Sequence, residues 1–325
     1  MRPSEDYIYA VSRIRVKETK LLSEKHIEQM LSLPDKDSVL RFLSERGWGS
    51  DKIHTSASDD IVSKENSKLW ELMKELNKDL SDFDFLRIQN DYHNIKASVK
   101  AVYTDSEPER FFLGGSVYDP MMLYNHIKKT EYSSLPEEFQ SVSEEAHKAL
   151  LKTGDGQLCD MIIDKAAMNA VYEYGKKSSC LLVKAYCEMY VASANIKIAI
   201  RGAKLLKSYD FMLGSMCPCD SIDIEKLAKE ASKGFDDVVS YLMTTDYRSA
   251  VDNIKASLSA FEKWCDNRII AMSKESKADP FTIAPLVAYI LAKQNELRAV
   301  GLILTAKENS LDSTLVRERI RDMYV

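Results

Sequence analysis

A short motif recurs at a fixed interval along the chain. The triplet Asn-Ile-Lys occupies residues 94–96 and again residues 195–197, 101 positions later, and the pair Leu297-Arg298 follows after another 101 positions. Around each copy, apolar residues recur every three or four positions, which is the period of an amphipathic helix. The chain must therefore accommodate several copies of one helical unit, which favours a stacked or closed repeat architecture.

The order of elements around the motif supports a repeat better than the triplet does. In each copy a long helix with an apolar-then-basic pair precedes a turn-rich connection and one or two short helices. Residues 37–48 also align with residues 236–247, so that Trp48 corresponds to Tyr247. Because residues 253–255 repeat the triplet out of register, the triplet alone is a weak indicator.

We predict three similar helical domains from this repeat. Two are continuous and span residues 51–152 and 153–246, whereas the third combines residues 247–325 with residues 1–50. The two chain ends are combined because the C-terminal stretch lacks the final short helix of a unit and the N-terminal stretch lacks the first. The alternative is that the N-terminal residues form a degenerate appendage.

Chain breakers are scarce, with only 11 Gly and 8 Pro in 325 residues, so long helices are expected. No stretch alternates apolar and polar residues between turn signals as a half-buried strand would. The predicted fold class is therefore all-α. One helix is expected to end near Tyr174, because Gly175 then has the C′ position that glycine often takes.

The longest apolar run covers only 12 residues, from Phe281 to Ala292. A membrane-spanning helix needs about 20 apolar residues, so this run is predicted to be a buried core helix and no membrane span is expected. The N-terminal residues lack the apolar segment of a signal peptide. We therefore expect a cytoplasmic protein whose cysteines are mostly reduced and buried.

Binding of nucleic acid or nucleotide is not supported by the sequence. The net charge is −5, whereas the phosphates of a nucleic acid usually require a basic surface. A phosphate-binding P-loop needs two glycines at a fixed spacing before a lysine and a hydroxyl residue. The nearest approach, at Gly175, has Ala170 and Lys177 at two of these positions, and the dinucleotide pattern G-x-G-x-x-G does not occur.

Metal-binding and catalytic patterns are also missing from the sequence. None of the five histidines lies three or four residues from another His or Cys, the spacing that presents two ligands on one helix face. Cys217 and Cys219 would supply only two of the four ligands that zinc prefers, so a plain loop is the better interpretation. The aspartate pairs at residues 59–60 and 236–237 are better explained as helix caps. We predict no catalytic, metal-binding or cofactor-binding residue.

Arg15, Lys96, Lys197 and Arg298 are the candidate interface residues. Each directly follows a core-facing apolar residue, and one position corresponds to about 100° around a helix. This places the four cations at the rim of the buried face, where they are candidates for contacts with a partner. The alternative is a solvated side chain whose aliphatic stem covers apolar surface.

The C-terminal run from Pro280 to Val325 resembles the end of the C subunit of V-type and A-type rotary ATPases, which is called the d subunit in eukaryotes. The similar features are the stretch PLVAYILAKQNELR and the closing Met-Tyr-Val. The opening residues 7–22 and the segment NDYHNIKASVKA also look like that family, so the resemblance spans essentially the whole chain. The chain departs from the family pattern at two places. Family members more often have Glu-Asn-Glu-Ile-Arg where this chain has residues 293–298, and the Cys-Pro-Cys loop is not typical of the family.

The resemblance implies three helical domains arranged as a funnel with pseudo-threefold symmetry. It also implies a non-catalytic subunit that receives the central shaft, made of subunits D and F, and rests on the membrane proteolipid (c/K) ring. A protein in this position couples rotation to the passage of H⁺ or Na⁺, while ATP is hydrolysed or made elsewhere in the complex. It would be peripheral to the membrane on the cytoplasmic side. The alternative function is a helical-repeat scaffold outside a rotary motor.

Overall fold

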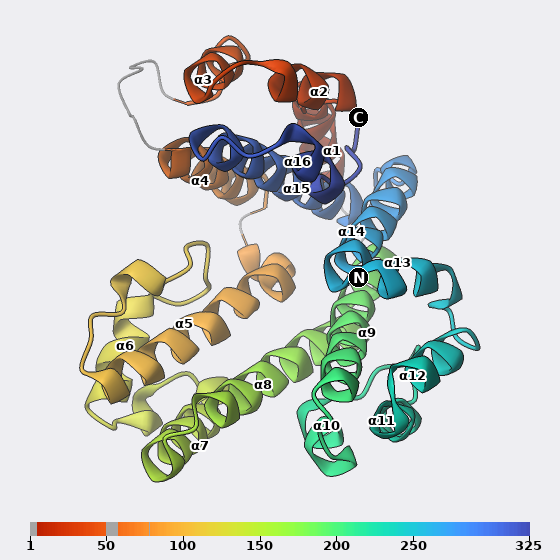
Figure 1. Ribbon diagram of the computed structural model, residues 1–325. Helices are drawn as coiled ribbons and strands as arrows, with labels where there is room; N and C mark the ends of the chain where they lie inside the picture. The colour runs from red at the N-terminus through yellow and green to blue at the C-terminus, as the bar shows by residue number, and fades with distance from the viewer. Residues whose placement is uncertain (1–4, 50–57, 78) are drawn as a thin grey trace. The chain divides into compact units, whose positions relative to one another are not determined.

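The computed structural model describes residues 5–49, 58–77 and 79–325. Within these ranges the regular elements are sixteen α-helices and five short 3₁₀ turns, and no strand occurs in them. The prediction of an all-α fold is therefore confirmed (Figure 1). The helices belong to two compact units, one formed by residues 1–80, 179–185 and 252–325 and the other by residues 81–178 and 186–251. The division into three domains stays a prediction.

The first unit is built around one long helix, α15 (Ala284–Glu308). The helices that contact α15 come from both parts of the chain: α1 (Glu5–Glu18), α2 (Glu24–Ser32), α3 (Lys36–Ser44), α4 (Ser58–Leu76), α14 (Leu258–Glu275) and α16 (Ser313–Arg319). Every residue from Ala284 to Lys293 is buried, so α15 is covered on all sides. A helix that is apolar all round is expected inside a domain. The prediction of a buried core helix is therefore confirmed from Ala284 to Ala292, whereas Phe281 precedes the helix and is 54% exposed.

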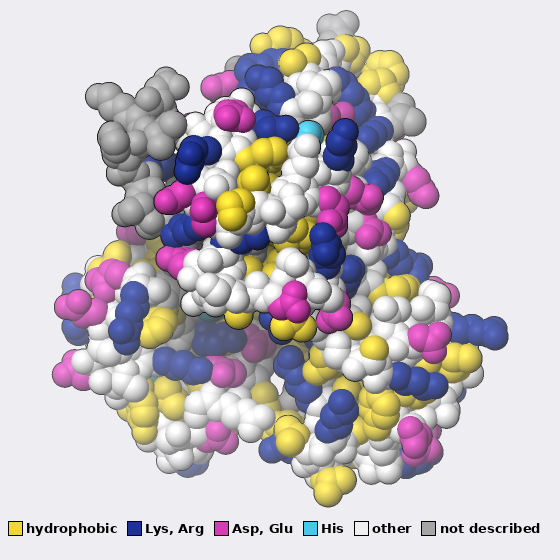
Figure 2. Space-filling model, turned by 45° about the horizontal axis from the view of Figure 1, so that its top comes forward, with side chains coloured by type: hydrophobic (Ala, Val, Ile, Leu, Met, Phe, Trp, Pro, Cys, Tyr) yellow, Lys and Arg dark blue, Asp and Glu magenta, His cyan; other side chains and the backbone are white. Residues whose placement is uncertain are grey.

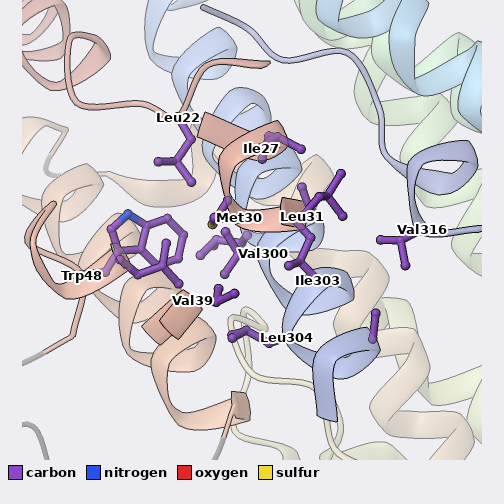
Figure 3. Close-up of a cluster of buried hydrophobic side chains, with 14 of the residues drawn as sticks. Leu22, Ile27, Met30, Leu31, Val39, Trp48, Val300, Ile303, Leu304 and Val316 are labelled. Atoms are coloured by element: carbon purple, nitrogen blue, oxygen red, sulfur yellow. The ribbon is translucent and has the colours of Figure 1, made fainter. Parts of the chain in front are cut away.

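The core of the first unit lies where α2 and α3 pack on α15. Figure 3 shows Met30 of α2 and Val39 of α3 directed toward Val300 of α15, with Trp48 at the edge of the cluster. Met30, Val39 and Val300 are completely buried. Burying each such side chain contributes about 1.5–3 kcal/mol relative to leaving it exposed. The two ends of the chain are thus held together mainly by apolar packing.

The second unit contains α5 (Asp84–Thr104), α6 (Pro120–Lys128), α7 (Glu137–Thr153), α8 (Gly156–Lys177), α9 (Leu181–Lys204), α10 (Tyr209–Ser215), α11 (Ile224–Lys233) and α12 (Phe235–Leu242), although the first residues of α9 are grouped with the first unit. Helix α5 packs on α6, α7 and α8. Phe139 of α7 is completely buried and meets Tyr92 edge-on, with ring centroids 5.1 Å apart. Such aromatic pairs add to the stability gained by burial alone.

Gly175 has a different role from the predicted helix end. Helix α8 continues through Gly175 to Lys177, so the expected end near Tyr174 was wrong. A Cβ atom at position 175 would lie 2.6 Å from the Cβ of Cys187 in α9, which is closer than atoms can approach. The missing side chain lets α8 and α9 pack closely. The last turn is favoured by Lys176 and Lys177, whose charges suit a helix C-terminus.

No helix in the described part of the chain combines the length and the apolarity that are needed to span a bilayer.

Candidate interaction surface

Three buried polar residues occupy the same position in the repeat. Asn94, Asn195 and Glu296 stand directly before the apolar-then-basic pairs of α5, α9 and α15, at intervals of 101 residues. All three side chains are completely buried. A buried polar group is costly unless it forms hydrogen bonds, so each needs a partner inside its own unit.

The two asparagines clamp a loop to their helix in the same way. The side-chain amide of Asn94 donates to the carbonyl of Leu113 (3.0 Å) and accepts from the Leu113 N–H (2.8 Å). Asn195 donates to the carbonyl of Cys217 (2.7 Å) and accepts from its N–H (3.0 Å). In both cases one side chain satisfies both backbone groups of one loop residue, so the loop is fixed to the long helix.

Glu296 forms a related clamp with a different donor set. Its carboxylate accepts from the N–H of Leu22 (2.5 Å) and from Nζ of Lys293 (2.5 Å). A carboxylate has no proton to donate, so it cannot copy the second hydrogen bond of an asparagine. Burial raises the pKa of Glu296 above its usual value. The positive charge of Lys293 opposes this shift only in part. This clamp joins α15 to the loop between α1 and α2, near the other end of the chain.

The clamping residues recur at the interval on which the repeat was predicted. In the second unit the clamped loop residue comes 19 or 22 positions after its asparagine. The residue that Glu296 of α15 clamps is Leu22, which comes before α15 in sequence. The polar residue before each apolar-then-basic pair had no predicted role. The recurrence of asparagine in the triplet was the available signal.

The four candidate interface cations lie beside buried residues, as predicted. Their preceding residues Ile14, Ile95, Ile196 and Leu297 are at most 5% exposed. The cations themselves are half-buried, except Arg298, which is exposed. Arg15 and Arg298 belong to the first unit and Lys96 and Lys197 to the second.

Three of these cations pair with a carboxylate of their own unit. Lys96 of α5 forms an ion pair with Asp164 of α8. The guanidinium of Arg298 lies 3.1 Å from Asp266 of α14. Arg15 pairs with Glu18 within α1 at 2.7 Å and also donates to the carbonyl of Lys277. Their role at an interface stays a prediction, and the ion pairs mean that a partner would compete with carboxylates already in place.

An apolar hollow opens in the second unit next to Lys96's partner Asp164. It has a volume of about 280 Å³ and is lined by Met161, Met168, Leu205 and Phe211 together with charged side chains such as Arg201. Leu205 is 65% exposed at the end of α9. An apolar hollow with a polar rim is typical of a contact site for another protein.

Asp91 holds the same loop as Asn94 and has an unusual proton affinity. Its completely buried carboxylate accepts from the N–H groups of Val117 (2.9 Å) and Tyr118 (3.0 Å). Burial raises the pKa of Asp91 from 3.8 to about 6, and these hydrogen bonds oppose the shift only in part. The folded chain therefore binds this proton more tightly than the unfolded chain does.

We expect the contribution of Asp91 to stability to decrease as the pH is raised. A pKa that folding raises stabilises the protein fully below pH 3.8, and this stabilisation is lost as the pH rises through about 6. The unfolding free energy of the native chain minus that of Asp91→Asn should fall by on the order of 3 kcal/mol over this range. Urea unfolding at several pH values measures this difference. A carboxyl ¹³C resonance of Asp91 that titrates below 3.8 would contradict the prediction.

The cysteine loop holds one buried thiol, Cys217, and one half-buried thiol, Cys219. Sγ of Cys217 lies 2.6 Å from the side-chain oxygen of Asn169. Burial raises the pKa of Cys217 to about 12 and that of Cys219 to about 11, so both thiols are protonated at neutral pH. A protonated thiol is a poor nucleophile and a poor metal ligand. Within the described ranges, no group of three or more His, Cys, Asp or Glu residues is arranged to hold a metal ion.

Charges of both signs share the surface. On the face shown in Figure 2, Lys and Arg side chains are interspersed with Asp and Glu side chains, and apolar side chains lie between them. A nucleic-acid site would require a continuous basic stripe. The mixed pattern on this face is that of an ordinary protein surface.

Comparison with known proteins identifies the family. The model of the family described as ATP synthase (C/AC39) subunit matches residues 10–319. The chain belongs to this family. The resemblance inferred from the sequence is thus confirmed, and the match covers the clamp residues of both units.

Individual members of the C/AC39 family are similar along nearly their whole length. The C subunit of the V-type sodium ATPase of Enterococcus hirae is 22% identical over 318 residues, which cover 96% of this chain and 97% of that protein. The C subunit of the A-type ATP synthase of Methanosarcina mazei is 23% identical over 352 aligned positions, covering 98% and 93%. Its counterpart in the A-type ATP synthase of Pyrococcus horikoshii is 22% identical, covering 98% and 90%.

Proposed function

We propose that this protein is the non-catalytic C subunit of a V/A-type rotary ATPase. It links the central shaft of subunits D and F to the membrane proteolipid (c/K) ring and so couples ATP hydrolysis or synthesis to the transport of H⁺ or Na⁺. The observation that carries this proposal is the family match over residues 10–319, together with relatives named as C subunits that align over nearly their whole length. The protein is peripheral to the membrane, on its cytoplasmic side.

The folded chain supports a mechanical role. In each unit a long helix is fixed to a loop by a completely buried polar side chain, Asn94 or Asn195 in one and Glu296 in the other. Side-chain clamps of this kind keep neighbouring segments in one arrangement. An adaptor that transmits torque must resist deformation between its two contact faces, and these clamps stiffen the segments that would carry the load.

The contact residues follow from the same features. Lys96 and Lys197 lie at the rim of the buried faces of α5 and α9, and the apolar hollow beside Leu205 offers a site for a partner side chain. A contact that relies on charge forms quickly and weakens with salt. This suits a joint that must assemble and come apart.

Binding to both neighbours tests the proposed function. Native mass spectrometry would be carried out on the full chain mixed with the cognate D–F pair and, separately, with the detergent-solubilised ring. We expect one-to-one complexes with each. If the folded chain bound neither the D–F pair nor the ring, the proposed role in a rotary ATPase would be wrong. A helical-repeat scaffold outside a rotary motor would then be favoured.

Charge reversal tests the rim residues. The variant with Lys96→Glu and Lys197→Glu should bind the shaft or the ring at least tenfold more weakly, which is about 1.4 kcal/mol. The matched control is Lys152→Glu with Lys229→Glu, which makes the same charge change at exposed positions of the same unit. Equal affinities of the two variants would contradict a role for the rim.

A further inference from the structure

The first unit contains a pocket that the proposed function does not use. Its volume is about 210 Å³, and it lies among the end of α1, the segment after α3, and helices α4 and α15. Its lining residues are Lys17, Lys20, Leu21, Arg46, Gly47, Trp48, Glu65, Lys68, Leu69, Leu72, Tyr289 and Lys293. All of them belong to the first unit.

Positive charge dominates this pocket. Among the described residues that line it, five are cations and Glu65 is the single carboxylate. The chain as a whole has a net charge of −5, so the concentration of cations here does not reflect the composition. A hollow lined by charges of one sign concentrates counter-ions, because its low-dielectric walls focus the field.

Two of the five cations are neutralised by carboxylates. Lys68 lies 2.6 Å from Glu65, and Lys293 lies 2.5 Å from Glu296 and 3.5 Å from Glu65. Lys293 also lies 4.1 Å from the centre of the Trp48 ring. These residues form the floor of the pocket, since Glu65, Lys293 and Trp48 are each at most 9% exposed.

The other three cations keep their charge available. Lys17 and Lys20 have no carboxylate within ion-pair distance in the part of the chain that the structure describes. The guanidinium of Arg46 stacks on the Phe42 ring at 3.8 Å, which holds it in place without neutralising it.

We propose that this pocket binds a small polyvalent anion of the phosphate class, such as a pyrophosphate group. Its volume is below the roughly 300–1,000 Å³ of pockets that enclose a drug-sized ligand, so it suits a phosphate group better than a whole nucleotide. Lysine and arginine form strong charge-assisted hydrogen bonds with phosphate oxygens. The anion sits over the floor of Trp48 and Lys293 and is held by Lys17, Lys20 and Arg46. This binding does not depend on the rotary function.

Calorimetric titration of the full chain with inorganic pyrophosphate at low salt tests the site. We expect saturable one-to-one binding that is at least tenfold weaker in the variant with Lys17→Gln and Lys20→Gln. Neither lysine has a carboxylate partner in the described residues, so this variant should fold normally. The matched control, Lys25→Gln with Lys274→Gln, removes the same charge from exposed positions of the same unit and should bind like the native chain.

A second arm distinguishes a free anion from a phosphorylated lipid headgroup. Phosphatidylcholine vesicles with and without phosphatidylinositol bisphosphate would be sedimented with the native chain. Binding to the phosphorylated vesicles that pyrophosphate displaces identifies the headgroup as the source, whereas pyrophosphate binding without vesicle binding identifies a soluble anion. The proposal is overturned if the native chain binds neither probe, or if the control variant loses as much affinity as the pocket variant.

Discussion

Replacing Glu296 by leucine is expected to lower the unfolding free energy by about 3–5 kcal/mol. The substitution leaves Lys293 buried with only Glu65 at 3.5 Å, and it leaves the N–H of Leu22 without its acceptor. Removing one partner of a buried ion pair costs far more than the pair contributes, because the remaining charge stays in a poorly solvating environment. Urea unfolding followed by circular dichroism measures the loss.

A double variant separates this charge effect from loss of packing. Combining Glu296→Leu with Lys293→Met removes both charges, so most of the lost stability should return. Glu296→Gln retains an acceptor for the Leu22 N–H. Its unfolding free energy should therefore lie between those of Glu296→Leu and the double variant. If Glu296→Leu alone cost less than about 1 kcal/mol, the clamp between α15 and the α1–α2 loop would contribute little to the fold.

Replacing Asn195 by leucine is expected to cost about 3 kcal/mol, because it strands both backbone groups of one loop residue. The N–H and C=O of Cys217 each lose a partner, and a buried polar group left without one costs about 1–3 kcal/mol. Hydrogen exchange at the Cys217 amide should accelerate by roughly a hundredfold, since each 1.4 kcal/mol is about a factor of ten. Exchange measured by NMR or mass spectrometry reports this locally.

The equivalent position supplies an internal comparison for that result. Asn94→Leu should have a similar effect at Leu113, because the two clamps have the same geometry. Asn309→Leu is the control, because Asn309 is exposed at the end of α15. This substitution should lower the unfolding free energy by less than about 1 kcal/mol. Normal protection of Cys217 in Asn195→Leu would show that other contacts fix the loop.

Periodicity predicted the helices, the fold class and the buried central helix. The part of the apolar run from Ala284 to Ala292 forms a helix that has no polar face, and a helix of that kind must be enclosed by others. The same reasoning placed Arg15, Lys96 and their counterparts one position from the core. It could not supply their partners, because Asp164 and Asp266 come from neighbouring helices whose packing a one-dimensional pattern does not specify.

The clamps and the pocket were beyond sequence reasoning for the same reason. Asn94 and Asn195 look like surface residues in a helical pattern, and only the folded chain brings Leu113 and Cys217 to them. The sequence shows Lys17 and Lys20 as neighbours, but Lys68 and Lys293 join them from distant segments. Gly175 was misassigned because a glycine near a helix end fits two roles, and the proximity of Cys187 decides between them.

The joining of both chain ends in one unit has a consequence for how the protein is made. Helices α1 to α4 leave the ribosome long before α15, which begins at Ala284. At a translation rate of about 5–20 residues per second, the apolar faces of these helices stay uncovered for roughly 10–40 s until α15 is made. Chaperones that hold nascent chains are therefore expected to act on the first 80 residues. The hydrogen bond from the Tyr324 hydroxyl to Glu18, at 2.8 Å, can form only after Tyr324 has left the ribosome.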